Sequence, residues 1–427
     1  MALPKVKADA TEARLAGLTL PDTVPDARQA ALARVSAMGL PHNRDEYWRF
    51  TNPRRLVQAD APHAKVPAVQ DAPLWDDLDR VKIVFVDGVF DADRSDDPEA
   101  AGLEIMQLSD ALSTDISWAK DLYGTLETRG QKPVDRPFAA LNTAMATEGL
   151  AIRATAKAAK PVNLIYDRES EDADPLLHTL IKVDAGAEMT LLETGAGGAR
   201  FSSVIEIDVG EGGTFHHVRD QGRDHERTVV THCFAQVASD ATFKSFTLSV
   251  NGALARNECI IDIRGDDATA HVAGACVGDG KDFHHDDTIF VTHDAVNCES
   301  RQVFKKVLRN GATGVFQGKI LVKDGAQKTD GYQISQSLML DDDSQFLAKP
   351  ELEIYADDVA CSHGSTSGAI DETALFYLQS RGVPRKQATD LLTLAFLAES
   401  LQEIEDDTLA EALRDRLAGW LERHATV

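Results

Sequence analysis

The middle of the chain repeats a short pattern of apolar and turn residues. Between residues 171 and 368, an apolar-x-apolar pair followed by Asp, Gly or Ala recurs with gaps of 26, 28, 26, 28, 31 and 34 residues. The pairs are Ile181/Val183, Ile207/Val209, Ala235/Val237, Ile261/Ile263, Ile289/Val291, Ile320/Val322 and Ile354/Ala356. One such turn cannot bury its apolar face alone, so stacked turns must close a common core. The pattern predicts a parallel β-helix, which we expect to be right-handed. A β-sandwich fits less well, because its turns recur every ~8–12 residues.

The regions on either side of this repeat have other patterns, so we expect three domains: a mixed and helical domain at 1–170, the β-helix at 171–368 and a helical domain at 369–427. In the first domain, "PDARQAALARVSAMGLP" predicts a short helix that Gly39 ends. "VKIVFVDGVFDA" predicts a strand that turns back at Asp87-Gly88, a strong hairpin signal.

The C-terminal region predicts three amphipathic helices. Asp371 is placed to cap the first helix, and Gly382 and Pro384 end it. In the last helix Leu409, Leu413, Leu417, Trp420 and Leu421 share one face. We expect these helices to pack on the end of the solenoid, on one another or on a partner, and the end of the solenoid is the simplest of the three.

The five cysteines are scattered and include no C-x-x-C pair, which argues against a disulfide framework and against a self-contained zinc or cluster site. Cys233 and Cys259 each lie four residues before the second member of an apolar pair. Side chains alternate along a strand, so both cysteines should point inward and stack in adjacent turns of the core.

Charge and motifs exclude several classes of function. Lys and Arg number 44 and Asp and Glu 69, so the net charge of −25 repels nucleic acid and anionic lipid. The start of the chain has no apolar segment typical of a signal peptide, so we expect a cytoplasmic protein. No G-x-x-x-x-G-K-[ST] motif occurs, so we expect no ATP on this chain.

Candidate chemistry lies in "LEIYADDVACSHGSTSG", residues 352–368. Cys361 and His363 are two residues apart, so on a strand they point to the same side. The imidazole could there stabilise a thiolate or share iron or zinc with it. Two ligands leave a metal site incomplete, which predicts a transient site or one completed by another chain. We expect Asp357 and Asp358 to form a turn.

A second polar group occurs in "DFHHDDTIFVTHDAVNCESRQVF" and contains His284, His285 and His293. Its composition is compatible with a metal site. Histidines divided between a turn and a strand need not converge, however, and hydrogen-bonded ladders between turns are the simpler interpretation.

Two longer stretches resemble a known family. From "RQVFKKVLRNGATGVFQGKILVKDGAQKTDGYQ" to "KPELEIYADDVACSHGSTSGAIDETALFYLQSRGV", the chain resembles the SufB/SufD family of the SUF iron–sulfur cluster assembly system. Gly364 after His363, "GLPHNRDEYWRFTNPRRL" and "VFVDGVF" resemble the SufD branch, because the SufB branch tends to have glutamate after this histidine.

The resemblance implies a parallel β-helix and a non-catalytic scaffold subunit of a SufB–SufC–SufD complex. Such a complex builds nascent clusters from iron and from persulfide sulfur delivered by a cysteine desulfurase and its sulfur shuttle, and reduced flavin is associated with it. Cys361 and His363 would be transient ligands at the interface with a SufB-like chain, and the isolated chain could form a homodimer. The ATPase SufC would dock on the C-terminal helices, for which the candidate residues are Phe376, Leu391, Leu394, Phe396, Leu397, Leu413 and Trp420.

Two other functions remain open. A carbohydrate-active β-helix enzyme would use carboxylates on one face of the solenoid. A SufB-like homodimeric scaffold is the second alternative, and Gly364 argues against it.

Overall fold

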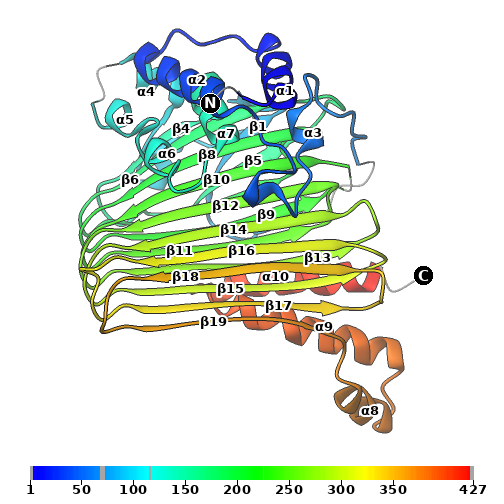
Figure 1. Cartoon of the computed structure of the whole chain (residues 1–427). Helices are drawn as coiled ribbons and strands as arrows, with labels where there is room; N and C mark the ends of the chain where they lie inside the picture. Colours follow the sequence, from blue (N-terminus) through cyan, green and yellow to red (C-terminus); the bar gives the residue numbers. More distant parts are fainter. Residues whose placement is uncertain (1–2, 68–72, 115–116, 225, 424–427) are drawn as a thin grey trace.

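The chain forms two facing β-sheets, and successive strands belong alternately to one sheet and the other. The computed structural model describes residues 3–67, 73–114, 117–224 and 226–423. From β4 onward, successive strands alternate between a ten-stranded sheet, called sheet A, and a nine-stranded sheet, called sheet B (Figure 1). Neighbouring strands are parallel except for the β1–β2 and β3–β4 pairs. The predicted parallel β-helix is therefore confirmed.

The strands of each sheet stack in the order of the solenoid turns. In that spatial order, sheet A contains β19 (Ala360–Gly368), β17 (Asp330–Met339), β15 (Glu299–Arg309), β13 (Thr269–Asp279), β11 (Thr242–Val250), β9 (Thr214–Arg223), β7 (Glu188–Gly195), β5 (Val162–Asp167), β1 (Val81–Val86) and β2 (Val89–Asp91). Sheet B contains β18 (Gln345–Ile354), β16 (Thr313–Val322), β14 (His284–His293), β12 (Leu254–Ile263), β10 (Thr228–Val237), β8 (Arg200–Val209), β6 (Leu176–Val183), β4 (Leu150–Ala154) and β3 (Glu104–Gln107). Both sheets include strands from before residue 171, and the expected domain limits stay a prediction.

The apolar repeat belongs to sheet B alone, and two of its seven pairs are displaced. Ile261 and Ile263 align with Val291 and His293 of β14, not with Ile289 and Val291 as predicted. In the last turn Leu352 and Ile354 occupy the repeat position, because Ala356 lies beyond the end of β18. The pair in β14 was misplaced because one of its two inward residues is His293, and a search for apolar pairs does not find a histidine. The buried His293 ring is tolerated because its Nε2 lies 2.8 Å from the Ser300 hydroxyl.

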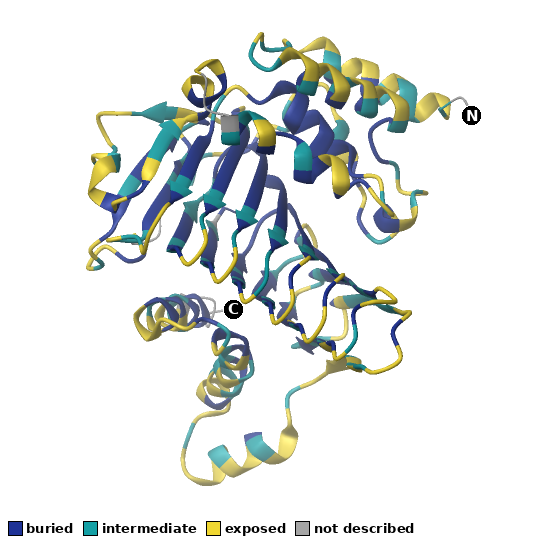
Figure 2. Cartoon of the chain, turned by 90° about the vertical axis from the view of Figure 1, so that its left-hand side faces the viewer, coloured by how far each residue is buried: buried dark blue, intermediate teal, exposed yellow. Residues whose placement is uncertain are grey.

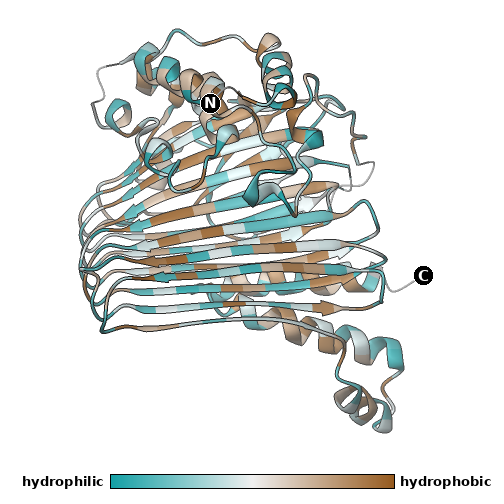
Figure 3. Cartoon of the chain, viewed as in Figure 1, coloured by the Kyte–Doolittle hydropathy of each residue, from teal (hydrophilic) through white to brown (hydrophobic). Residues whose placement is uncertain are grey.

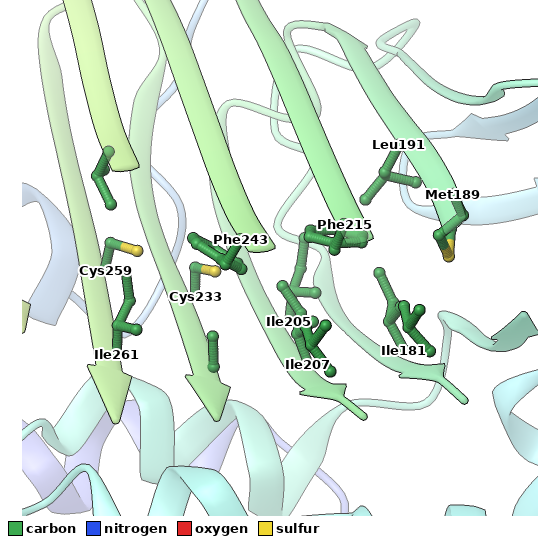
Figure 4. Close-up of a cluster of buried hydrophobic side chains, with 14 of the residues drawn as sticks. Ile181, Met189, Leu191, Ile205, Ile207, Phe215, Cys233, Phe243, Cys259 and Ile261 are labelled. Atoms are coloured by element: carbon green, nitrogen blue, oxygen red, sulfur yellow. The ribbon is translucent and has the colours of Figure 1, made fainter. Parts of the chain in front are cut away.

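The core between the sheets is built from inward side chains that stack from turn to turn. Bands of apolar residues cross the strands at matching positions (Figure 3). Cys233 and Cys259 are paired in register and buried among these side chains, with Phe243 of the opposite sheet beside them, which confirms the sequence prediction (Figure 4). Apolar burial of this kind is the main source of the stability of a solenoid.

The N-terminal region covers the outer face of sheet B. Its helices are α1 (Lys5–Ala16), α2 (Pro25–Met38), α3 (Arg54–Val57), α4 (Leu108–Ser113), α5 (Ser117–Leu122), α6 (Thr125–Arg129) and α7 (Pro137–Met145), with short 3₁₀ turns at Glu46–Trp48 and Pro98–Ala101. Outward side chains such as Phe234 and Phe290 pack against α4 to α7. The predicted helix end at Gly39 is confirmed by its φ of +64°, and β1 and β2 form the predicted hairpin at Asp87-Gly88.

The C-terminal helices cover the outer face of sheet A. They are α8 (Glu372–Ser380), α9 (Arg385–Leu401) and α10 (Asp407–Arg423). Asp371 caps α8 as predicted, because its side chain accepts hydrogen bonds from two backbone N–H groups. The expected packing on the end of the solenoid is wrong: α9 and α10 lie against the side of sheet A, where outward residues such as Val218, Phe246 and Val307 are apolar. Helix α8 projects away from the body (Figure 2).

Candidate functional site

The strand that carries Cys361 and His363 is the last strand of sheet A. In the described chain β19 pairs with β17 on one side, and its other edge has no strand beside it. An open strand edge exposes backbone N–H and C=O groups that can pair with a second chain. The solenoid therefore ends in an open rim, as the sequence-based hypothesis requires.

The inward face of sheet A becomes polar in its last two strands. The inward positions of β17 are Gly331, Gln333, Ser335 and Ser337, and each aligns with a residue of β19: Cys361, His363, Ser365 and Ser367. Hydroxyl groups pair between the turns, with Ser335 Oγ 3.0 Å from Ser365 Oγ and Ser337 Oγ 3.2 Å from Ser367 Oγ. We call these eight residues the polar mouth.

Cys361 lies half-buried at one end of the polar mouth. It packs against the small apolar cluster of Ile320, Val322, Ala326 and Ala356 in the last turn. Burial raises the pKa of the Cys361 thiol, and the carboxylate of Asp330 adds to the effect. The raised pKa favours the protonated thiol over the thiolate in the isolated chain.

His363 is exposed on the same inward side of β19 as Cys361, because the two residues are separated by one alternation of the strand. Within the described part of the chain, no three His, Cys, Asp or Glu side chains are grouped so that they could hold a metal ion. The arrangement can therefore supply a thiol and an imidazole to a metal, but it leaves the remaining positions to other ligands. Asp357 and Asp358 lie exposed in the bend between β18 and β19, where we expected turn residues.

The three histidines of the second candidate group do not converge. All lie on β14, but His284 points outward to the Thr51 hydroxyl at 2.9 Å, whereas His285 and His293 point into the core. His285 Nδ1 lies 2.8 Å from the buried Lys306 ammonium. The three histidines therefore do not converge, as expected, but the expected division between a turn and a strand is wrong, because all three lie on one strand and two of them are buried in the core.

Comparison with known proteins agrees with this arrangement of the fold. The model of the SufBD core domain of the SUF system for FeS cluster assembly matches residues 167–396. The chain belongs to the SufB/SufD family. It is 28% identical to the iron–sulfur cluster assembly protein SufD of Escherichia coli, in an alignment that covers 92% of each chain. A SufBD family protein of Synechocystis is 27% identical over 91% of this chain and 89% of its own. SufD of Bacillus subtilis is 25% identical over 69% of this chain and 68% of its own.

Among the described residues of this SufD-like chain, no helix has the length and apolarity needed to cross a membrane. The β-helix and the match to the SUF family support an iron–sulfur assembly protein over a carbohydrate-active enzyme. The cytoplasmic location stays a prediction.

The candidate docking residues for an ATPase fall into two groups. Phe376 on α8 and Leu391 on α9 are 72% and 46% exposed. Leu397, Leu413 and Trp420 are fully buried in the contact between the helices and sheet A, and Leu394 and Phe396 are partly buried there. Phe376 and Leu391 are therefore the members of the set that a partner could contact directly.

One residue of the polar mouth, Gln333, was not predicted from the sequence. It lies one turn below His363. The available signal was the alternation of polar residues in "GYQISQS" and, thirty residues later, in "CSHGSTS". Each alternation looks like an ordinary half-exposed strand on its own. Their relation becomes visible only when the register that aligns Gln333 with His363 is known.

Proposed function

We propose that this SufD-like chain is a non-catalytic scaffold subunit that contributes Cys361 and His363 to an iron–sulfur cluster assembled against a SufB-like chain. The observation that supports the proposal most strongly is the position of this incomplete ligand pair at the open rim of the solenoid. Thiolate and imidazole are both ligands of iron in clusters. The remaining ligands would come from sulfide and from the partner.

The protonated state of Cys361 fits a site that forms only on assembly. Iron binds the thiolate, so coordination must release the thiol proton to solvent. Burial disfavours the thiolate in the isolated chain. The thiol would therefore become a ligand when iron and the partner chain arrive together, which keeps the free subunit from holding iron in an exposed site.

The same proposal assigns the other steps of assembly to partners. A SufC-like ATPase would bind ATP and dock on α8 and α9 through Phe376 and Leu391. Persulfide sulfur would come from a cysteine desulfurase and its shuttle, and reduced flavin would bind to the complex. The open edge of β19 could also pair with the same edge of a second copy, which supports a homodimer of the isolated chain.

Coexpression with SufB and SufC homologues tests the proposal. His363→Ala should lower the iron and sulfide of the purified complex severalfold while the three subunits still copurify. The matched control is Ser362→Ala, which alters an exposed neighbour on the same strand, and it should retain the wild-type cluster content. Full cluster content in the His363→Ala complex would remove His363 from the site.

A further inference from the structure

A column of three side chains connects His363 to the interior of the solenoid. Gln302 of β15, Gln333 of β17 and His363 of β19 occupy the same register position. Gln302 and Gln333 are fully buried, whereas His363 is exposed at the top of the column. Parallel strands in register lie about 4.8 Å apart, so side chains on adjacent turns stack directly on one another.

The hydrogen bonds give this column a direction. Gln302 Nε2 donates to the backbone carbonyl of Lys319 at 3.5 Å, and Gln333 Nε2 donates to Gln302 Oε1 at 2.8 Å. A carbonyl can only accept, so the Lys319 carbonyl requires Gln302 to turn its Oε1 toward Gln333. Gln302 therefore directs its donor to the opposite sheet and its acceptor to Gln333, and the acceptor of Gln333 is left on the side away from Gln302, which is the side of the open rim.

The last acceptor of the column has no partner. Gln333 Oε1 is buried and accepts no hydrogen bond from any residue that the structure describes. Buried polar atoms are nearly always paired, so an orphan acceptor requires an explanation. The next inward residue above it is His363, which carries N–H groups and lies on an exposed strand where its ring can turn.

The opposite sheet leaves space for this amide. A side chain at Gly318 of β16 would place its Cβ 2.4 Å from Gln333 Nε2 and 2.7 Å from Gln333 Cδ. Only glycine therefore leaves this space free, and the Gln333 side chain fills it across the interior. The Gln333 amide is thus held on two sides, by its hydrogen bond to Gln302 and by its close approach to Gly318.

We propose that Gln333 is a positioning residue for His363. Its Oε1 accepts the N–H of one ring nitrogen and selects the tautomer in which the other nitrogen directs its lone pair out of the open rim. Ligating histidines commonly donate their second N–H to a carbonyl or carboxylate, which fixes the ring and increases its basicity. The consequence for iron rests on the function proposed above, but the selection of a tautomer does not.

The tautomer can be measured on the isolated full-length chain. Histidine labelled with ¹⁵N reports the two ring nitrogens by NMR at pH 8, where an ordinary imidazole is largely neutral. The His363 signals are assigned by their loss in His363→Ala. Gln333→Met keeps the length of the side chain and removes the acceptor, and Gln333→Leu serves if that variant is unstable. We expect one tautomer to dominate in the wild type and the bias to be lost in the variant.

Two further variants separate positioning from a structural effect. Gln333→Glu retains an acceptor and should restore the tautomer. Gln302→Leu removes the acceptor of Gln333 Nε2 but keeps Gln333 Oε1 and the space at Gly318, so it should weaken the bias much less than Gln333→Met does. The inference is overturned if Gln333→Met leaves the tautomer unchanged, or if Gln302→Leu alters it as strongly.

The consequence for function is measured with ferrous iron on the assembled complex. Gln333→Met should weaken iron binding by about 10- to 100-fold, the range found for residues that orient a ligand, and Gln333→Glu should recover most of the loss. Suppose that Gln333→Met shifts the tautomer of His363 but the His363→Ala complex has normal cluster content. This result would contradict the proposed function and leave the role of Gln333 intact. Unchanged iron affinity in a variant with a shifted tautomer would overturn the proposed consequence for iron.

Discussion

Cys233 of β10 and Cys259 of β12 occupy the same position in successive turns, and their thiols meet inside the core (Figure 4). The contact with Cys233 and burial raise the pKa of the Cys259 thiol well above its ordinary value. Both groups therefore act as small apolar side chains.

Replacement of Cys233 should test this packing role. Cys233→Ala leaves a small cavity and should lower the free energy of unfolding by about 1–3 kcal/mol, measured by urea denaturation. The cluster content of the coexpressed complex should not change. A loss of cluster content in a variant that still folds would instead indicate a role in chemistry.

Cys361 should be the thiol that reacts in the native chain. All five cysteines lie in the described residues, and the other four are buried. Iodoacetamide should therefore label one site in the folded chain and none in Cys361→Ser. Because burial raises the pKa of this thiol, its labelling rate should still be rising above pH ~8.5, the ordinary thiol value. A midpoint below that value would show that His363 stabilises the thiolate after all.

Exposed and buried residues of the C-terminal helices should respond differently to substitution. Phe376→Ser with Leu391→Ser should reduce copurification with a SufC homologue and leave the melting temperature almost unchanged, because both side chains are exposed. Val89→Ser is the matched control, since Val89 is 60% exposed on β2, a strand of the opposite end.

Trp420→Ala should lower the stability of the chain, whereas the Phe376 and Leu391 variant should lower copurification with the SufC homologue. This side chain is fully buried in the contact between helix α10 and sheet A, so its removal should cost about 3–5 kcal/mol of stability. Undiminished copurification in the Phe376 and Leu391 variant would place the ATPase on another surface.

Acid should destabilise the fold in two ranges of pH. Burial lowers the pKa of His232 and of His293 to about 4, so the unfolded chain binds protons that the folded chain excludes. The stability that these neutral rings retain above pH ~6.5 is lost as the pH falls toward 4. Burial alone would raise the pKa of Glu258, but Arg256 and Arg136 lower it to about 2. The stability that ionised Glu258 contributes is therefore lost at lower pH, as the pH falls from the ordinary carboxyl pKa toward 2.

His293→Asn isolates one of these histidines. The variant should be less stable than the wild type at pH 7.5, because the contact with Ser300 is altered, but should lose less further stability between pH 6.5 and 4.5. Melting temperatures across this range measure the difference, and His63→Asn is the control because its side chain is 60% exposed. An unchanged slope in His293→Asn would contradict the assignment.

The sequence predicted the fold where inward residues were apolar. Sheet B was found through its repeated pairs, and the stacking of Cys233 and Cys259 followed from their register. The strands of sheet A were not recognised as a second repeat, because inward positions such as Ser300, Gln302 and Ser335 are polar. These side chains are buried and hydrogen-bonded either across the interior to the opposite sheet or to the next turn, and a pattern of hydrophobicity does not record such pairings.

The candidate site was predicted only in part. The spacing of Cys361 and His363 was sufficient to place both on one side of a strand. The contact partners of each depend on residues about thirty positions away, which the register of the solenoid brings together. The amphipathic helices were also recognised, but their target was not, because one apolar face fits the end or the side of a solenoid equally well.

The polar mouth has a consequence for the free subunit. A solenoid with an open last strand and a wholly apolar inner face would continue into further copies of itself and form fibrils, as exposed strand edges tend to do. In this chain the last inward positions of sheet A are an imidazole, a thiol and two hydroxyls, whose hydration opposes such growth. The residues that we propose to contact a partner should thereby also oppose aggregation of the unpartnered chain.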